Sequence, residues 1–238
     1  MDIVILAGGR CSEELREMSG KDFRSELEFR GKSMVQIALD AVAGMGRAVL
    51  VGGPKLEGLN QVPAGEKFID SLRNGLGAVT APTYLQVTAD LPFLDQESIQ
   101  KFLSLCKPGA AVNYPIVETR LCEASYPGMK RTSITLREGK FTGGNIALLD
   151  TEAMRRALPL LEDAYQKRKS PTKLAKLVGP GVLGRFLMSR LIPSTLNLTY
   201  LEKAVGRIIG LNVSAIVTPC PDIAADIDTA EQYRSLPN

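Results

Sequence analysis

The chain opens with an apolar segment, Ile3 to Ala7, that stops at the pair Gly8-Gly9. The segment shows no alternation of polar and apolar residues and is rich in β-branched side chains. This pattern is typical of a strand buried on both faces, as in a parallel sheet covered by helices. Segments with helical spacing and further strand-like runs then alternate along the chain, at 33–45, 48–51, 70–79, 84–89 and 95–106. This order predicts an α/β domain with a mostly parallel sheet.

After about residue 110 the pattern changes. Strand-like runs follow at 110–117, 132–137 and 141–149, and the last two resemble a hairpin appended to the sheet. Residues 151–211 are mostly helical in pattern, and a final strand is expected at 213–217. Within the helical part, Thr199 with Glu202 three residues later predicts a capping box. We therefore expect one three-layer, Rossmann-like α/β/α domain over residues 1–238, with a helical elaboration at about 151–211.

The chain contains no histidine. This excludes Ser-His-Asp triads, Cys-His pairs and zinc sites built on imidazole. Carboxylates, lysines, arginines and the backbone must then carry any chemistry, and these groups suit phosphoryl and nucleotidyl transfer. Lys and Arg total 29 against 26 for Asp and Glu, and the resulting net charge of +3 is too small to indicate a nucleic-acid or membrane partner.

The cysteine pattern and the lengths of the apolar segments indicate the cellular compartment. The four cysteines form no C-x-x-C pair, which indicates reduced thiols. No signal-peptide pattern is visible, and the longest apolar stretch, at about 208–217, is too short to span a membrane. We therefore expect a cytoplasmic protein.

Three short motifs carry the candidate chemistry. The turn Gly8-Gly9 follows the first strand, where ligands of parallel sheets bind and where glycines let backbone N–H groups approach a phosphate. Asp90 ends the strand at 84–89, a position from which a carboxylate can bind a hard cation. Asp226 and Asp228 alternate in an extended segment, so both can face one site. Each motif also has a structural interpretation, as a tight turn or as a helix cap. The glycine pair matches neither a Walker A motif nor the dinucleotide fingerprint.

Taken together with Gly31-Lys32-Ser33-Met34, Asp90-Leu91-Pro92 and the segment Asp226–Tyr233, these motifs resemble one family. The chain looks like a nucleotidyltransferase of the molybdopterin-cofactor type, within the nucleotide-diphospho-sugar transferase fold. The resemblance spans residues 1–150 and 212–236. It implies a glycosyltransferase-A-like arrangement of the sheet.

The resemblance also assigns roles to residues. For the nucleotide it implies contacts from Leu6, Ala7, Gly8, Gly9, Arg10, Ser71 and Asp90. For the metal it implies that Asp90 and Asp228 hold Mg²⁺. The family has a catalytic lysine in the loop before Gly31, and this loop offers two candidates to act with the carboxylates, Arg24 and Lys21. For the acceptor it implies the glycine-rich strand at Gly143, Gly144 and Asn145. The basic pair Lys130-Arg131 either clamps an anionic acceptor or lies in a solvated loop.

The implied reaction is Mg²⁺-dependent transfer of a nucleoside monophosphate from CTP or GTP to a phosphorylated small molecule, with release of pyrophosphate. Two alternatives remain open. A nucleotide-binding sensor or scaffold without turnover is favoured by the displaced lysine. A glycosyltransferase of related fold would want a second Asp beside Asp90, which Leu91-Pro92 does not supply. We assign the helical elaboration to acceptor choice or to contacts in a homodimer.

Overall fold

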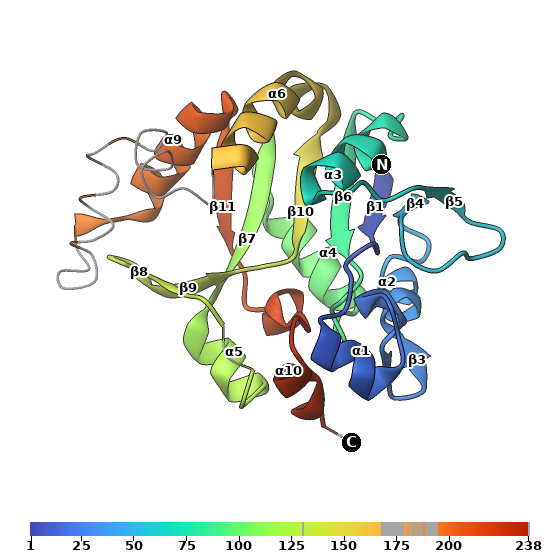
Figure 1. The fold of residues 1–238 in the computed structure, drawn as a ribbon. Helices are drawn as coiled ribbons and strands as arrows, with labels where there is room; N and C mark the ends of the chain where they lie inside the picture. Colours follow the sequence, from blue (N-terminus) through green and yellow to red (C-terminus); the bar gives the residue numbers. More distant parts are fainter. Residues whose placement is uncertain are drawn as a thin grey trace.

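The computed structural model describes residues 1–129, 131–167 and 195–237, together with residues 179, 181, 184 and 188. One large sheet runs through these residues. Its strands are β1 (Asp2–Leu6), β4 (Arg47–Val51), β5 (Asn60–Val62), β6 (Thr83–Thr88), β7 (Val112–Glu118), β8 (Ile134–Leu136), β9 (Gly139–Gly143), β10 (Ile146–Asp150) and β11 (Val213–Val217). Eight of the nine strands lie in the order β5-β4-β1-β6-β10-β7-β9-β8, and the ninth, β11, lies beside β7 (Figure 1).

The sheet is mostly parallel, as predicted. β1 pairs in parallel with both β4 and β6, and β4 pairs in parallel with β5. β10 is antiparallel to both of its neighbours, β6 and β7, so these two neighbours point the same way. β7 is parallel to β11 and antiparallel to β9. The carboxyl ends of β1, β4, β6, β7 and β11 therefore meet at one edge of the sheet.

Helices cover both faces of the sheet, which confirms the α/β/α class. They are α1 (Glu13–Ser19), α2 (Met34–Ala41), α3 (Phe68–Gly77), α4 (Gln96–Leu105), α5 (Thr119–Ser125), α6 (Thr151–Lys167), α9 (Leu198–Ile209) and α10 (Ala230–Arg234), with 3₁₀ turns η1 (Arg24–Glu26) and η3 (Pro221–Ala224) and a small hairpin of β2 (Glu28–Phe29) and β3 (Lys32–Ser33). α2 and α4 pack in one core with Ile3 and Ile5, whereas α3 and α6 pack in another with Val4. Because successive strand residues face opposite sides, both faces of β1 are apolar.

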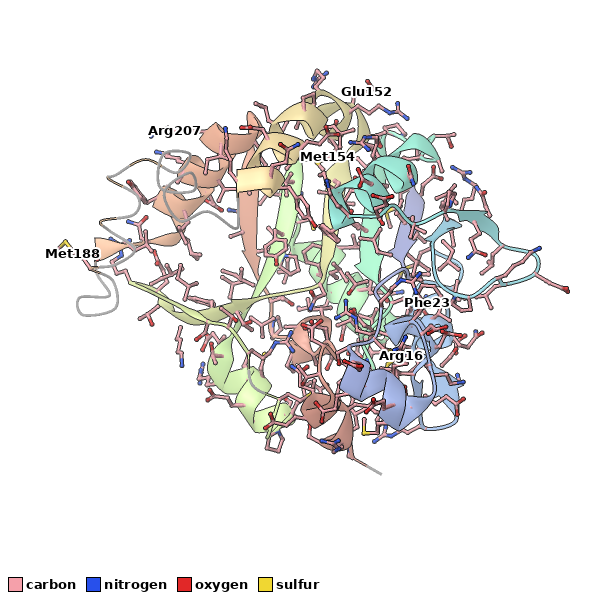
Figure 2. All side chains as sticks on the ribbon, viewed as in Figure 1. Arg16, Phe23, Glu152, Met154, Met188 and Arg207 are labelled. Carbon is pink, nitrogen blue, oxygen red and sulfur yellow. The ribbon has the colours of Figure 1, made fainter. Side chains whose placement is uncertain are left out.

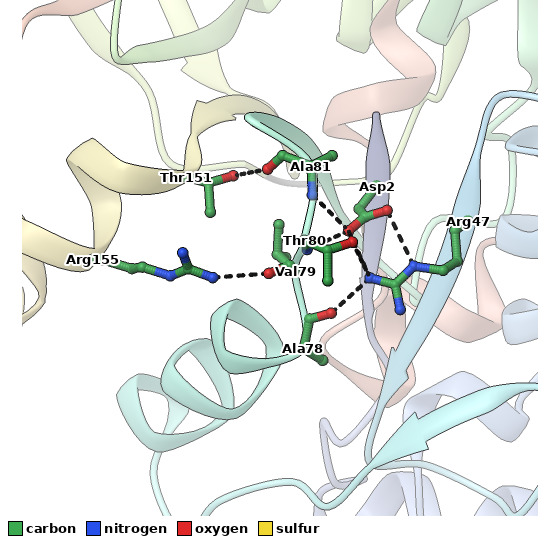
Figure 3. Close-up of polar contacts among 8 residues, drawn as sticks. All are labelled: Asp2, Arg47, Ala78, Val79, Thr80, Ala81, Thr151 and Arg155. Carbon is green, nitrogen blue, oxygen red and sulfur yellow. Dashed lines mark hydrogen bonds and ion pairs between the residues drawn. The ribbon is translucent and has the colours of Figure 1, made fainter.

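The helix α6 shows the same division between core and solvent. Met154 is buried against the sheet, while Glu152 points away from it at the top of the molecule (Figure 2). The side chains of Thr151 and Arg155 donate hydrogen bonds to the carbonyls of Ala81 and Val79, at 2.7 and 2.8 Å (Figure 3). These bonds attach α6 to the loop that enters β6.

Two local predictions are wrong. The expected single strand at 141–149 is two strands, β9 and β10, because the amides of Gly144 and Asn145 between them donate to the carbonyls of Pro115 and Ile223. The expected capping box does not form. Asn197 caps α9 by accepting from the amide of Tyr200, and the Glu202 carboxylate accepts from Ala215 in β11.

The helices α6 and α9 lie at the two ends of the predicted helical elaboration. Most of the residues between these two helices lie outside the described residues. Of the helices in the described part of the chain, none combines the length and the apolar character needed to cross a membrane.

At the amino end of β1, the buried carboxylate of Asp2 is surrounded by donors (Figure 3). It accepts two bonds from the guanidinium of Arg47, at 2.7 and 3.2 Å, and bonds from the amides of Thr80 and Ala81, at 2.7 and 3.2 Å. The Arg47 guanidinium holds the pKa of Asp2 well below its ordinary value, against the opposing effect of burial. This carboxylate therefore fastens β1 to β4 and to the loop before β6.

Candidate active site

Two glycine turns meet at the carboxyl edge of the sheet. Gly8 follows β1, and Gly52 follows the neighbouring strand β4. A Cβ atom added to either glycine would lie 2.6 Å from the Cβ of Ala64, and one added to Gly52 would lie 2.9 Å from the Cα of Gly8. Gly52 also has a φ of +68°, which favours glycine. The three segments thus approach each other more closely than side chains would allow.

An open cavity of about 840 Å³ lies against these turns. Backbone from four glycines and two cationic side chains contribute to its wall. The cationic side chains are Arg10, whose guanidinium lies 5.1 Å from the centre of the Phe23 ring, and Lys55. The lining residues are Gly8, Arg10, Phe23, Gly52, Gly53, Lys55, Gln61, Val62, Pro63, Ala64, Gly65 and Glu66. Accessible backbone and nearby cations suit a ligand that carries phosphates.

The far wall of this cavity is held by α3. The Oγ atom of Ser71 accepts a hydrogen bond from the amide of Gly65 at 3.0 Å. The side chain of Asn74 donates to the carbonyl of Pro63 at 2.9 Å. Ser71, expected to contact the nucleotide base, therefore supports the loop that lines the cavity and does not itself appear among the lining residues.

The carboxylates of Asp90 and Asp228 converge on one guanidinium. Arg24 lies 3.3 Å from Asp90 through its Nη2 atom and contacts Asp228 through Nη1. The backbone amide of Arg24 donates to the carbonyl of Gly9 at 2.8 Å. A Cβ on Gly9 would lie 2.7 Å from Nη2 of Arg24, so the glycine gives the guanidinium its room. The structure thus brings together four of the candidate residues, Gly9, Arg24, Asp90 and Asp228.

The environment of Asp90 disfavours its charge. Burial raises the pKa of this carboxyl, the nearby Arg24 opposes that effect, and Asp226 adds to it. Within the described residues, the Oδ1 atom of Asp90 and the Nε atom of Arg24 are buried without a hydrogen-bond partner. Because buried polar atoms nearly always have partners, these two atoms mark a place that a ligand would complete.

A third carboxylate, Asp226, lies close by; the sequence pattern allows it to face the same site as Asp228, although the family resemblance assigns it no role. It is paired with the guanidinium of Arg131 and accepts from the side chain of Asn145 at 2.8 Å. The amide of Ile227 donates to the carbonyl of Asp90 at 3.0 Å, which holds this segment against the end of β6. Two predicted acceptor residues, Arg131 and Asn145, thus lie together beside the carboxylate pair.

The glycines of the predicted acceptor strand lie nearby. A Cβ on Gly143 would lie 2.4 Å from the hydroxyl of Tyr114, and one on Gly144 would lie 2.9 Å from the ring of Pro115. Both glycines therefore allow β9 and the following turn to pack directly on β7.

Other predicted residues lie elsewhere. Lys21 forms an ion pair with Glu28 at 3.4 Å, and no contact with Asp90 or Asp228 is recorded for it in the described structure. Ala7 is buried, and it accepts from the Ser25 hydroxyl at 2.8 Å. Leu6, the last residue of β1, packs against the core shared with α3. Lys130 lies outside the described residues.

Sequence reasoning missed part of the cavity. Gly52 and Gly53 directly follow the strand-like run at 48–51, and the family resemblance assigns them no role. The signal was the repetition of a Gly-Gly turn after two strands that a parallel sheet makes neighbours. Lys55 and Gln61 carry no local signal, because their places depend on how the loop between β4 and β5 returns.

The carboxylate pair fits a divalent metal only in part. The unpartnered oxygen of Asp90 is a suitable ligand for Mg²⁺, and Asp228 adds a second carboxylate. Across the described part of the chain, however, no group of three or more His, Cys, Asp or Glu side chains gathers as a metal site. Mg²⁺ is commonly held by one or two carboxylates with water and substrate phosphates. The residues therefore fit a metal whose remaining ligands come from a nucleotide and from water.

This site, at the carboxyl edge of an α/β sheet with glycine turns and converging carboxylates, defines a nucleotide-binding class of fold. The family model of the MobA-like NTP transferase domain matches residues 3–176. The chain belongs to this family of nucleotidyltransferases.

Solved structures agree with the assignment. A hypothetical transferase from Thermus thermophilus is 36% identical, with a TM-score of 0.86, and the match covers 97% of this chain and 98% of that one. CMP:2-keto-3-deoxy-manno-octonic acid synthetase, in complex with CTP, is 14% identical with a TM-score of 0.58 over 98% of this chain and 94% of that one.

A third similar structure is 2-C-methyl-D-erythritol 4-phosphate cytidylyltransferase from Thermus thermophilus. It is 14% identical, with a TM-score of 0.55 over 98% of this chain and 96% of that one. At this identity the likeness concerns the fold. None of the curated proteins matches the chain.

Proposed function

We propose that this chain is a Mg²⁺-dependent nucleotidyltransferase that moves a nucleoside monophosphate from CTP or GTP to a phosphorylated small molecule. The observation that carries the proposal is the convergence of Asp90 and Asp228 beside a cavity walled by glycine turns. CTP is the first donor to test, because one similar structure is a cytidylyltransferase and another is a complex with CTP.

The nucleotide belongs in the glycine-walled cavity. The turns at Gly8 and Gly52 offer backbone N–H groups to the phosphates, and Arg10 and Lys55 offer positive charge. Asp90 and Asp228 would hold Mg²⁺, which when bound neutralises charge on the triphosphate. The remaining catalysis is positioning of two reactants, which needs no histidine.

The acceptor belongs on the side of Arg131 and Asn145. One terminal nitrogen of Arg131 is paired with Asp226, while Nε and Nη1 are buried without a partner among the described residues. Free guanidinium N–H groups suit a phosphate or carboxylate oxygen. Asn145 shares the same carboxylate and so fixes its orientation. These contacts support an anionic acceptor next to Asp90, whose own carbonyl accepts a hydrogen bond from the Asp226–Asp228 segment.

A second candidate, nucleotide binding without turnover, rests on Arg24. This arginine stands where the family has a lysine, and it contacts both carboxylates that a metal would need. A glycosyltransferase activity is the third alternative. Both alternatives can be distinguished from the proposal. Nucleotide binding without turnover releases no pyrophosphate, and a glycosyltransferase uses a sugar nucleotide as its donor in place of a free triphosphate.

A thermal-shift panel with ATP, CTP, GTP and UTP, each with and without Mg²⁺, tests the binding step on wild type and Asp90→Asn. A ligand of the native state raises stability by RT ln(1 + [L]/Kd). We expect a Mg²⁺-dependent shift with CTP or GTP that Asp90→Asn removes, followed by pyrophosphate release when phosphorylated acceptors are screened. A shift without pyrophosphate from any acceptor would support the sensor. No shift with any triphosphate would overturn the proposal, and sugar nucleotides would then be tested.

A further inference from the structure

One guanidinium serves both candidate metal ligands. Arg24 contacts Asp90 and Asp228 at the same time, and its side chain is 22% exposed, between 12% for Asp90 and 55% for Asp228. A divalent cation held between these two carboxylates would lie beside the Arg24 guanidinium, and the two positive charges would repel each other at short range. Arg24 and a divalent cation therefore compete for the position between Asp90 and Asp228.

The carboxylates alone make a poor metal site. No third His, Cys, Asp or Glu side chain joins them anywhere in the residues that the structure describes. Burial already disfavours the charge on Asp90, and Arg24 is the largest of the effects that offset this. A metal arriving without nucleotide would have to displace a charge partner and would gain only two protein ligands.

A nucleotide changes this balance by offering Arg24 another partner. The guanidinium lies on the Gly9 backbone, one residue from Gly8 in the cavity wall. Its Nε atom has no hydrogen-bond partner within the described structure, so a phosphate oxygen on this side would satisfy a group that is otherwise left alone.

The backbone of Arg24 is held in place by hydrogen bonds from this residue and the next. The Arg24 amide donates to the carbonyl of Gly9 at 2.8 Å, and the next residue, Ser25, donates its hydroxyl to the carbonyl of Ala7 at 2.8 Å. These bonds attach η1 to the turn after β1. A change of partner at Arg24 therefore requires only rotation of the side chain.

We propose that Arg24 makes metal binding depend on nucleotide. The inference rests on the proposed function. Without nucleotide, the guanidinium occupies the cation position between Asp90 and Asp228. When the triphosphate enters, Arg24 turns to its oxygens, and the freed carboxylates and the phosphates together take the metal. Because coupling between two ligands is reciprocal, the metal must also strengthen nucleotide binding.

Titration with Mn²⁺ alone, followed by the electron paramagnetic resonance signal of the free ion, tests this without any turnover. We expect wild type to bind Mn²⁺ weakly and Arg24→Gln to bind it at least about tenfold more tightly, a change of about 1.4 kcal/mol. Arg24→Lys keeps the charge but loses the planar fork, and we expect an intermediate affinity. The double variant Arg24→Gln/Asp90→Asn must lose the gain, which locates the ion at the carboxylates.

Arg16→Gln is the matched control, because it removes the same charge from an exposed position on α1 (Figure 2). It should bind Mn²⁺ as wild type does. Thermal unfolding checks that each variant is folded, and Arg24→Lys keeps the test available if Arg24→Gln is not.

The outcomes separate this inference from the proposed function. Equal Mn²⁺ affinity of wild type, Arg24→Lys and Arg24→Gln, with a normal CTP or GTP shift in wild type, would overturn the inference and leave the proposed function standing. Absence of any triphosphate shift, with a clear gain of Mn²⁺ binding in Arg24→Gln, would overturn the proposed function and leave the competition at the carboxylates demonstrated.

Discussion

The two edges of the central sheet each hold a buried aspartate that contacts an arginine. At the amino edge, both oxygens of Asp2 accept bonds, from Arg47 and from the loop before β6 (Figure 3). At the carboxyl edge, Asp90 contacts Arg24, but its Oδ1 atom has no partner among the described residues. A buried carboxylate whose two oxygens both accept hydrogen bonds stabilises the fold. A buried carboxylate with an unpartnered oxygen indicates a ligand that supplies the missing partner.

The pKa values express the same difference. Arg47 lowers the pKa of Asp2, and burial raises the pKa of Asp90 although Arg24 is close. The same pair of residue types thus gives opposite shifts, because burial is the largest effect on the pKa of Asp90, whereas the hydrogen bond from Arg47 is the largest effect on the pKa of Asp2. Strongly unfavourable burial of a charge is a mark of functional sites.

The largest expected effect is the loss of activity in Asp90→Asn. We expect pyrophosphate release to fall by a factor on the order of 10²–10³, as when one charge-stabilising group is removed from an active site. The melting temperature should stay equal or rise, because the substitution removes a charge whose burial is unfavourable. A fall in melting temperature comparable to that of Asp2→Asn would contradict the comparison.

Asp2→Asn should show the reverse. It weakens hydrogen bonds to a charged acceptor, each worth roughly 1.5–3 kcal/mol. For a domain of this size a loss of about 2–3 kcal/mol lowers the melting temperature by roughly 5–10 °C. Activity per folded molecule should be close to that of wild type, since Asp2 lies at the opposite edge from the cavity. Differential scanning calorimetry and pyrophosphate release measure the two quantities.

The two aspartates should also differ in the sign of their pH dependence. The folded pKa of Asp2 is below its ordinary value of 3.8, so its stabilisation is present above that value and is lost as the pH falls further. The folded pKa of Asp90 is raised, so its protonated form is favoured by folding and stability is lost as the pH rises through the raised pKa.

Melting curves between pH 3 and pH 7 measure this contrast. We expect the deficit of Asp2→Asn relative to wild type to shrink toward about pH 3, and any advantage of Asp90→Asn to grow toward pH 7. Parallel curves for the two variants would show that the two carboxylates do not differ in the way described.

The smallest effects concern neighbouring glycines. In Gly8→Ala the new Cβ would meet the Cβ of Ala64 at 2.6 Å, so the cavity wall must shift, and we expect triphosphate binding about tenfold weaker. In Gly9→Ala the new atom meets the flexible end of Arg24, so the guanidinium should move and Mn²⁺ binding should rise by a few-fold. Calorimetric titration distinguishes the two, and equal effects would contradict the separate roles.

Much of the fold could be predicted from the sequence because its signals are local. β1 and β4 contain apolar runs that end at glycine pairs, and β6 is rich in β-branched and aromatic residues and is followed by Asp90. Asp95 caps α4 by accepting from the amide of Ser98 at 2.8 Å. The break between β9 and β10 could not be predicted in this way. It depends on carbonyls of Pro115 and Ile223, which are distant in the sequence.

In the candidate site, too, the residues in local motifs could be predicted, and the contacts between distant segments could not. Gly8, Asp90 and Asp228 stand in recognisable motifs at predicted strand ends or in an extended segment. The partnership of Arg131 with Asp226 joins segments far apart in the chain, and only the folded sheet brings them together. The sequence also could not decide between Arg24 and Lys21, because spacing within a loop does not determine which side chain points toward the carboxylates.

The hydrogen bond from the amide of Ile227 to the carbonyl of Asp90 joins a segment that is synthesised late to the end of a strand that is synthesised much earlier. Gly8, Gly52 and Ala64 have all emerged long before Asp228, so the cavity can form around a nascent chain that still lacks half of its carboxylate pair. The pair is completed only when a late segment returns to the end of β6. The residues that line the cavity are therefore all synthesised before the segment that completes the carboxylate pair.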